Sequence, residues 1–221
     1  MIPVLDPVET RVLGALIEKE ATTPEYYPLS MNALVNACNQ KSNRWPVVDY
    51  DEDSVSDAML GLREKKFAVM VTGNGRVNKY AQRISETLNL GRRELAVLCT
   101  LLLRGPQTLG EIKDRSERIY SFADLEETER VIDKLAEWPD GPLAVKIPRQ
   151  PGQKESRVSH LLNGEPVLEQ ARGDTDFPTP ATGRVAQLEQ EVSELRKSLG
   201  ELRTDFLDLK RRFDELESQL R

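Results

Sequence analysis

The sequence predicts a mainly α-helical protein with small β-hairpins, made of two tandem winged-helix domains followed by a C-terminal coiled coil. One observation behind this prediction is a pattern of apolar and capping residues that occurs before residue 90 and again after it. The other is a heptad repeat of leucines near the end of the chain. The matching positions of the two copies include Glu9, Val12, Leu13, Leu16 and Ile17 with Glu94, Val97, Leu98, Leu101 and Leu102, Met59 and Leu62 with Ile132 and Leu135, and residues 67–71 with residues 143–147.

Each copy predicts three helices followed by a hairpin, which is the order of a winged helix. Apolar residues recur with the period of one helix face, and the first helix is expected to end near Lys19. The residues that we expect to cap helices are Asp6, Ser30 and Asp51 or Asp53 in the first copy, and Thr108 and Ser121 or Asp124 in the second. The expected strands are residues 67–72 and 77–82 around a glycine turn at 73–75, and residues 143–147 and 156–162.

These patterns divide the chain into four segments. We expect the first winged-helix domain at residues 1–88, the second at 89–170, a flexible linker at 171–183 and a coiled-coil dimerisation helix at 184–221. The linker is predicted from its glycine and proline residues.

The last segment carries apolar residues spaced alternately three and four apart from Val185 to Leu220. Every d position is a leucine, and the expected dimerisation residues are Leu188, Leu195, Leu202, Leu209 and Leu216. If two such helices run parallel, residues at g positions face e′ residues of opposite charge, as Glu191 faces Arg196. We therefore expect a parallel coiled-coil homodimer. The alternative is a single helix that folds back onto the domains of its own chain.

Composition excludes several classes of protein. The net charge is −6 and charged residues are spread evenly, so neither domain is a uniform surface for nucleic acid. Cys38 and Cys99 lie among apolar residues, which predicts two buried thiols in a reducing cytoplasm. The start of the chain does not resemble a signal peptide and no apolar run could span a bilayer, so we expect a cytoplasmic protein without a membrane partner.

No catalytic arrangement is visible in the sequence. His160 is the single histidine and falls on an expected strand, without a second histidine or a nearby cysteine to share a metal ion. The glycine turn at residues 73–75 is too short for a phosphate-binding loop. We therefore expect a protein that is not an enzyme and that needs no cofactor or metal.

The distribution of charged residues favours a binding protein. Its candidate cations lie mostly outside the third helix of each copy. Both third helices are acidic, for example at Asp57 and Asp133, and DNA phosphates would repel such a helix in the major groove. The candidate nucleic-acid-binding residues are Lys41, Arg44, Arg63, Lys65, Lys66, Arg76, Lys79, Lys146, Arg149, Lys154 and Arg157. One hypothesis is DNA association through the basic wings in a regulatory or chromosomal role. The alternatives are scattered surface cations without such a role, and a protein–protein adaptor that docks a partner on its acidic third helices.

The segment at residues 36–44 is rich in side-chain amides and contains Lys41 and Arg44. Such a loop either holds an anion or satisfies buried backbone groups with its Asn and Gln side chains, and we favour the structural role.

Several uncommon strings occur in order along the chain: RVLG at residues 11–14, LIEK at 16–19, ACNQKSNR at 37–44, ELAVLC at 94–99 and LLRGPQT at 102–108. With these strings, residues 5–165 resemble the YceH family of uncharacterised bacterial proteins. The resemblance implies a tandem winged-helix fold and supplies no activity, catalytic residue or binding residue. It also implies an acidic residue at position 45, where this chain has Trp45.

Overall fold

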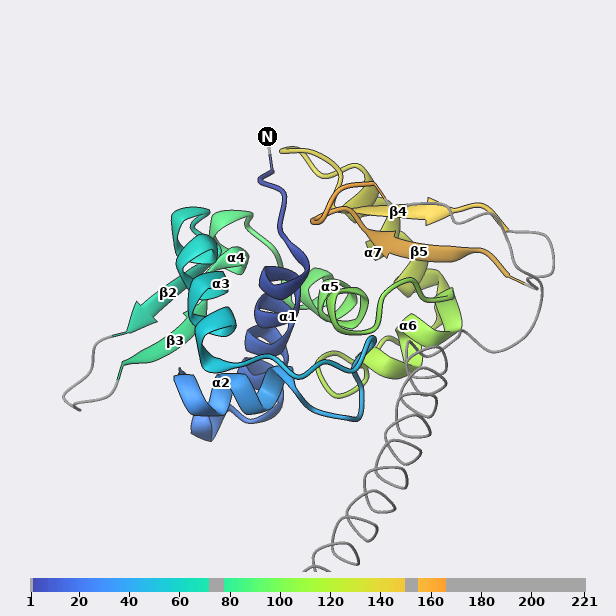
Figure 1. Ribbon diagram of the computed structural model, residues 1–221. Helices are drawn as coiled ribbons and strands as arrows, with labels where there is room; N and C mark the ends of the chain where they lie inside the picture. The colour runs from blue at the N-terminus through green and yellow to red at the C-terminus, as the bar shows by residue number, and fades with distance from the viewer. Residues whose placement is uncertain (1, 72–77, 150–154, 166–221) are drawn as a thin grey trace, which may run out of the picture. The chain divides into compact units, whose positions relative to one another are not determined.

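The computed structural model describes residues 2–71, 78–149 and 155–165, and Figure 1 shows how their elements are arranged. In each half of this region, three helices are followed by an antiparallel hairpin. The first half contains α1 (Pro7–Thr22), α2 (Met31–Cys38), α3 (Glu52–Glu64), β2 (Ala68–Val71) and β3 (Lys79–Gln82). The second half contains α5 (Arg92–Arg104), α6 (Leu109–Ser116), α7 (Leu125–Ala136), β4 (Ala144–Ile147) and β5 (Arg157–His160). The prediction of a mainly helical protein with small hairpins is confirmed for these residues.

Several predictions concern residues outside the described ranges. They are the glycine turn at 73–75, the linker at 171–183, the coiled coil at 184–221 with its leucines, and the candidate cations Arg76 and Lys154. All described residues belong to one compact unit, so the domain limits 1–88 and 89–170 stay predictions.

Short polar side chains set the helix starts that the sequence predicts. The Asp6 carboxylate accepts hydrogen bonds from the first backbone N–H groups of α1, and Ser30 does the same for α2. Thr108 forms a capping box at the start of α6. The end of α1 differs from the prediction, because the helix continues past Lys19 to Thr22.

The third helices begin at matching positions of the two copies. Asp51, and not Asp53, accepts the capping hydrogen bond of α3, while Asp124, and not Ser121, accepts that of α7. Asp51 and Asp124 are separated from the matched apolar residues of their helices by the same number of positions. The residues of α3 and α7 can therefore be compared one by one.

Three short elements are additional to the prediction: η1 (Pro24–Tyr26), β1 (Leu29–Ser30) and α4 (Ile84–Thr87). β1 pairs with β3, so the first hairpin becomes a three-stranded sheet in the order β1-β3-β2. In the second half, a bridge between Gln107 and Val158 takes the place of that strand. A strand of two residues shows no alternation of apolar and polar side chains, so sequence periodicity does not reveal it.

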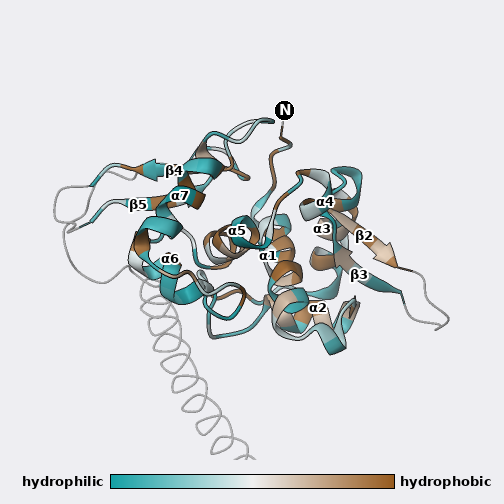
Figure 2. Ribbon diagram, turned by 180° about the vertical axis from the view of Figure 1, so that it is seen from behind, coloured by the Kyte–Doolittle hydropathy of each residue, from teal (hydrophilic) through white to brown (hydrophobic). Residues whose placement is uncertain are grey.

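α1 and α5 pack against each other at the centre of the described region, as Figure 1 shows. The contact is close because Gly14 has no side chain: a Cβ atom there would lie 2.8 Å from Cδ2 of Leu103. Cys99 Sγ donates a hydrogen bond to the Gly14 carbonyl oxygen over 3.5 Å. Figure 2 shows hydrophobic residues on both helices, and buried residues of the two halves form one continuous core.

The two halves also exchange matching backbone contacts. Leu5, which precedes α1, donates its N–H to the carbonyl oxygen of Leu162 beyond β5 at 2.6 Å. Leu90 matches Leu5 in the second copy, and its N–H bonds the carbonyl oxygen of Ser85 beyond β3 at 2.9 Å. When the two hairpins are aligned by their strand registers, Leu162 and Ser85 fall within one residue of each other. Each half therefore binds the segment that leads into the other half, as the subunits of a two-fold symmetric dimer do.

Candidate functional site

Arg44 lies in the loop between α2 and α3, and its side chain is fully buried. Its Nη2 lies 2.6 Å from Oε2 of Glu18 on α1. Nε and Nη2 also donate hydrogen bonds to the carbonyl oxygen of Ala37. These bonds hold the guanidinium inside the protein, so Arg44 is not available to a DNA phosphate and leaves the set of candidate cations. Lys41, in the same loop, is exposed.

The same loop joins the two halves of the described region. Trp45 donates its backbone N–H to the carbonyl oxygen of Leu103 at 2.8 Å, and its ring covers Gly105. A Cβ atom on Gly105 would lie 2.9 Å from that ring, and the φ angle of 69° at this residue suits glycine. Arg104 adds a hydrogen bond of 2.6 Å from Nη2 to Oδ1 of Asn43.

Polar groups of the loop are satisfied from within the protein. The Asn39 side-chain amide exchanges hydrogen bonds of 2.8 and 2.9 Å with the backbone of Tyr50. Arg11 on α1 donates to the carbonyl oxygens of Cys38 at 3.0 Å and Pro46 at 2.6 Å. These bonds favour the structural interpretation of residues 36–44, because Asn39 and Arg44, two of the side chains expected to hold an anion, bond backbone groups of the protein instead.

A buried carboxylate occupies the same position in both halves. Glu9 and Glu94 lie in the first turns of α1 and α5, and each forms an ion pair with a lysine of the third helix or its end. Glu94 pairs with Lys134 at 2.6 Å, and Glu9 pairs with Lys65. Lys134 matches Gly61, where a Cβ atom would overlap the Glu9 carboxylate. Lys65 therefore has a structural partner and is a weaker candidate for phosphate binding.

Three candidate cations of the first half are exposed and form no ion pair within the described ranges. Arg63 lies in the last turn of α3, Lys66 follows that helix and Lys79 begins β3. Lys66 has a φ angle of 62°, a left-handed conformation at the point where the chain leaves the helix for the hairpin. Among the described residues, the end of α3 and the start of β3 thus carry three cations that form no ion pair.

In the described part of the second hairpin, the candidate cations Lys146 and Arg157 form ion pairs. Lys146 on β4 lies 2.6 Å from Asp133 and 2.9 Å from Glu129, both on α7. The hydrogen bonds to Asp133 and Glu129 raise the pKa of Lys146. Arg157 on β5 donates to the carbonyl oxygen of Pro106 and lies 3.4 Å from Glu111. Arg149 is exposed at the edge of the described part of this hairpin.

The exposed surfaces of the third helices are acidic, as the sequence predicts. The exposed acids are Glu52, Asp53, Asp57 and Glu64 on α3, Glu126, Glu129 and Asp133 on α7, and Glu137 directly after α7. Each helix also presents one leucine to solvent: Leu60 is 54% exposed and Leu125 is 48% exposed.

His160 lies on β5, as predicted, and is buried. Burial lowers its pKa to about 4, and its Nδ1 has no hydrogen-bond partner among the described residues.

Cys38 and Cys99 are buried free thiols, as expected, and burial raises the pKa of Cys38 to about 12. In the ranges that the structure describes, no group of three or more His, Cys, Asp or Glu side chains could hold a metal ion. None of the helices seen there has the length and apolar character needed to cross a membrane.

The sequence profile of a family described as "Protein of unknown function, DUF480" matches residues 5–153, from the segment before α1 to the second hairpin. The chain belongs to the DUF480 family. A UPF0502 protein of Solibacter usitatus is 52% identical over 200 residues, which cover 87% of this chain and 93% of the relative. UPF0502 proteins of Opitutus terrae and Aeromonas hydrophila are 50% and 46% identical; the matches cover 88% and 87% of this chain and 84% and 92% of those relatives. The resemblance to the YceH family is thereby confirmed, and DUF480 relatives match over most of their length.

Proposed function

We propose that this DUF480 protein is a non-catalytic tandem winged-helix protein that binds duplex DNA through its first half. The observation that carries the proposal is a contrast between the two halves: Arg63 and Lys66 at the end of α3 and Lys79 on β3 have no ion-pair partner in the described ranges, whereas Lys146 and Arg157 on the second hairpin do. A phosphate group can bind the first set without displacing a carboxylate. The winged-helix assignment is supported by the repeated order of elements and by β1, which completes a three-stranded sheet.

The charges on α3 set the orientation of the proposed complex. Glu52 and Asp53 in the first turn would be repelled by phosphates, while Arg63 in the last turn would be attracted. We therefore expect the C-terminal end of α3 and the first hairpin to approach the DNA backbone. Such contacts supply affinity that depends on salt and give little discrimination between base sequences.

The test is a fluorescence-anisotropy titration of a mixed-sequence duplex at two salt concentrations. Replacement of Arg63 and Lys66 together by alanine should weaken binding at low salt and reduce the slope of log affinity against log salt by about 1.8, at about 0.9 for each phosphate contact. The matched control replaces Lys113 and Arg118, two cations of the second half, by alanine. It removes the same charge and should leave the slope almost unchanged.

A second variant addresses the second hairpin. If Arg149→Ala with Lys154→Ala weakens binding as much as the first-half variant does, the assignment to the first half is wrong. If every variant binds as the wild type does, the contacts lie elsewhere on the protein.

The second candidate function is a protein–protein adaptor, and the exposed leucines on acidic helices favour it. Leu125 lies beside exposed acids at the start of α7, a combination that suits a partner with basic and apolar residues. Absence of DNA binding at low salt would exclude the first proposal and leave this one. A partner that is bound by the wild type and lost in Leu125→Ser, with an unchanged fold, would support it.

A further inference from the structure

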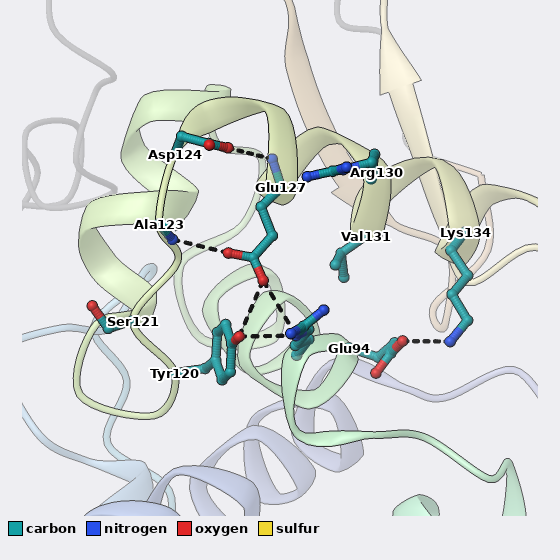
Figure 3. Close-up of a pocket in the computed structure, with 10 residues that line it drawn as sticks. Glu94, Tyr120, Ser121, Ala123, Asp124, Glu127, Arg130, Val131 and Lys134 are labelled. Atoms are coloured by element: carbon teal, nitrogen blue, oxygen red, sulfur yellow. Dashed lines mark hydrogen bonds and ion pairs between the residues drawn. The ribbon is translucent and has the colours of Figure 1, made fainter.

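A polar pocket of about 710 Å³ lies in the second half, between the first turn of α5, the loop after α6 and one side of α7. Figure 3 shows Glu127, Arg130 and Lys134 along α7, with Tyr120 and Ser121 from the loop on the other side. None of these residues was a candidate from the sequence, because the pocket is formed by segments that are distant along the chain.

A comparison of the two copies of the repeat distinguishes pocket residues that both halves share from pocket residues that only the second half has. Asp124 and Glu94 have the counterparts Asp51 and Glu9, so they belong to the architecture that both halves share. Arg93, Glu127 and Arg130 lack such counterparts, because they match Val8, Ser54 and Asp57. The first half reaches the same order of elements without their chemistry, so fold alone does not account for them.

Arg93 is held in one orientation by contacts on one edge of its guanidinium. Its Nε donates to the Tyr120 hydroxyl at 2.9 Å and lies 3.2 Å from Oε1 of Glu127. The guanidinium also stands over the Tyr120 ring, 5.3 Å from its centre. Its two terminal nitrogens form no hydrogen bond to any described residue, which leaves a pre-oriented pair of donors.

The partners of Arg93 are themselves fixed. Glu127 accepts a hydrogen bond of 2.9 Å from the backbone N–H of Ala123. The Tyr120 hydroxyl donates to Glu127 at 3.0 Å, and the Tyr120 ring meets Phe122 edge to face at 4.8 Å. Figure 3 shows these bonds converging on Glu127. Glu127 is thus a positioning residue for Arg93, and the negative charge of the Glu127 carboxylate is already compensated.

Arg130 supplies a second cation on the same side of α7. It is exposed and forms no hydrogen bond or ion pair with the described residues. The neighbouring Lys134 differs, because its charge is used by the buried carboxylate of Glu94 at 2.6 Å. Asp124 is used as the cap of α7, where the helix dipole offsets its charge.

We propose that this pocket binds the oxyanion group of a small molecule, with the open edge of Arg93 and the side chain of Arg130 as its donors. A guanidinium presents two parallel N–H groups that match the oxygens of a carboxylate or a phosphate. This inference does not depend on DNA binding, which is assigned to the other half of the chain.

The experiment titrates inorganic phosphate and, separately, succinate into the full-length protein at constant ionic strength, and follows backbone amide resonances by NMR. Saturable shifts at Ser121, Ala123 and Glu127 with either probe are expected, and the two probes distinguish a phosphate from a carboxylate ligand. Arg93→Gln and Arg130→Gln should each weaken the apparent affinity at least tenfold. Arg93→Lys should also weaken it, because lysine keeps the charge but lacks the paired donors.

Arg92→Gln is the matched control, since Arg92 is an exposed neighbour that does not line the pocket. It should leave the shifts unchanged. The proposal is overturned if neither probe gives saturable shifts in this pocket, or if the shifts persist when both Arg93 and Arg130 are replaced. An unchanged amide spectrum of each unliganded variant, away from the substituted residue, establishes that the fold is intact.

Discussion

Cys99 donates its thiol hydrogen to the Gly14 carbonyl oxygen across 3.5 Å, and these two residues stand at the same position in the two copies of the repeat. A residue meets its own counterpart only at or near an axis of two-fold symmetry. The reciprocal backbone bonds of Leu5 and Leu90 agree with such an axis. The two halves of the described region therefore pack like the subunits of a symmetric dimer, although one chain provides both.

Gly14→Ala is expected to destabilise the protein. The added Cβ atom would lie 2.8 Å from Cδ2 of Leu103 and 3.1 Å from Cβ of Leu102, in the contact between α1 and α5, so the Leu103 side chain or one of the helices must move. Overpacking of this kind costs roughly 1–3 kcal/mol of the free energy of unfolding, measured by urea denaturation. Gly110→Ala is the control: no atom lies within 4 Å of its added Cβ, and alanine favours the helix. Equal stability of the two variants would contradict close packing at Gly14.

Arg44→Leu is expected to destabilise the protein while Lys41→Leu is not. The Arg44 side chain is fully buried, and its loss leaves the Ala37 carbonyl oxygen without these hydrogen bonds and the partly buried Glu18 with only Lys19, at 3.8 Å, as an ion-pair partner. The cost should be roughly 2–4 kcal/mol in thermal or urea unfolding. Lys41 lies on the surface of the same loop, so its replacement should change stability by less than about 0.5 kcal/mol. A small effect at Arg44 would restore it as a candidate surface cation.

Stability should depend on the protonation of His160 at acid pH. Its pKa is about 4 in the folded protein and 6.5 in an unfolded chain, so the unfolded state binds more protons between these values. The free energy of unfolding should therefore fall as the pH decreases from 6.5 to 4, by up to roughly 3 kcal/mol from this residue.

His160→Gln isolates that contribution from the titration of carboxylates. Gln82 occupies the matching place on β3, where it is buried, so glutamine is compatible with this position of the hairpin. The difference in stability between wild type and variant should change across pH 4–6.5 and stay constant above that window. Parallel stability curves would show that His160 titrates normally.

The full-length protein should be a dimer by light scattering, and a chain ending at Gly173 should be a monomer. Leucines at successive d positions would supply the stability of a parallel coiled coil. Leu195→Glu with Leu202→Glu should also give a monomer, whereas Gln190→Glu with Thr204→Glu, on the outer face, should stay dimeric. A full-length monomer at tens of micromolar, or a truncated chain that remains a dimer, would refute dimerisation through this segment.

The helices and hairpins could be predicted because their signals are local. Asp6, Ser30 and Thr108 cap helices through bonds to residues close in sequence, and the apolar period identifies the buried face of each helix. Asp51 and Asp53 could not be separated in this way, since either side chain can cap the same turn. The close contact of Gly14 with α5 also has no local signal, because a glycine inside a helix reads only as a weak helix former.

The roles of the charged residues could be predicted only in part. The acidic character of the third helices follows from composition, but the use of Arg44 depends on Glu18, which α1 brings to it through tertiary packing. In the same way, Arg93 meets Tyr120 only because α5 and the loop after α6 come together. The sequence identifies the cationic residues, but tertiary packing determines which of them form ion pairs within the protein.

The ion pairs of Glu9 and Glu94 show that two halves can preserve an interaction without preserving the positions that make it. The lysine partner follows α3 in one half, at Lys65, and lies one turn earlier on α7 in the other, at Lys134. A lysine stem is long enough to deliver its ammonium group to the same carboxylate from either place. Among DUF480 sequences, the residues at positions 61 and 65 should therefore vary together, because a chain that acquires lysine at 61 can lose the lysine at 65. An alignment inspected at only one of these two positions would then suggest that the ion pair is missing, although the other position supplies it.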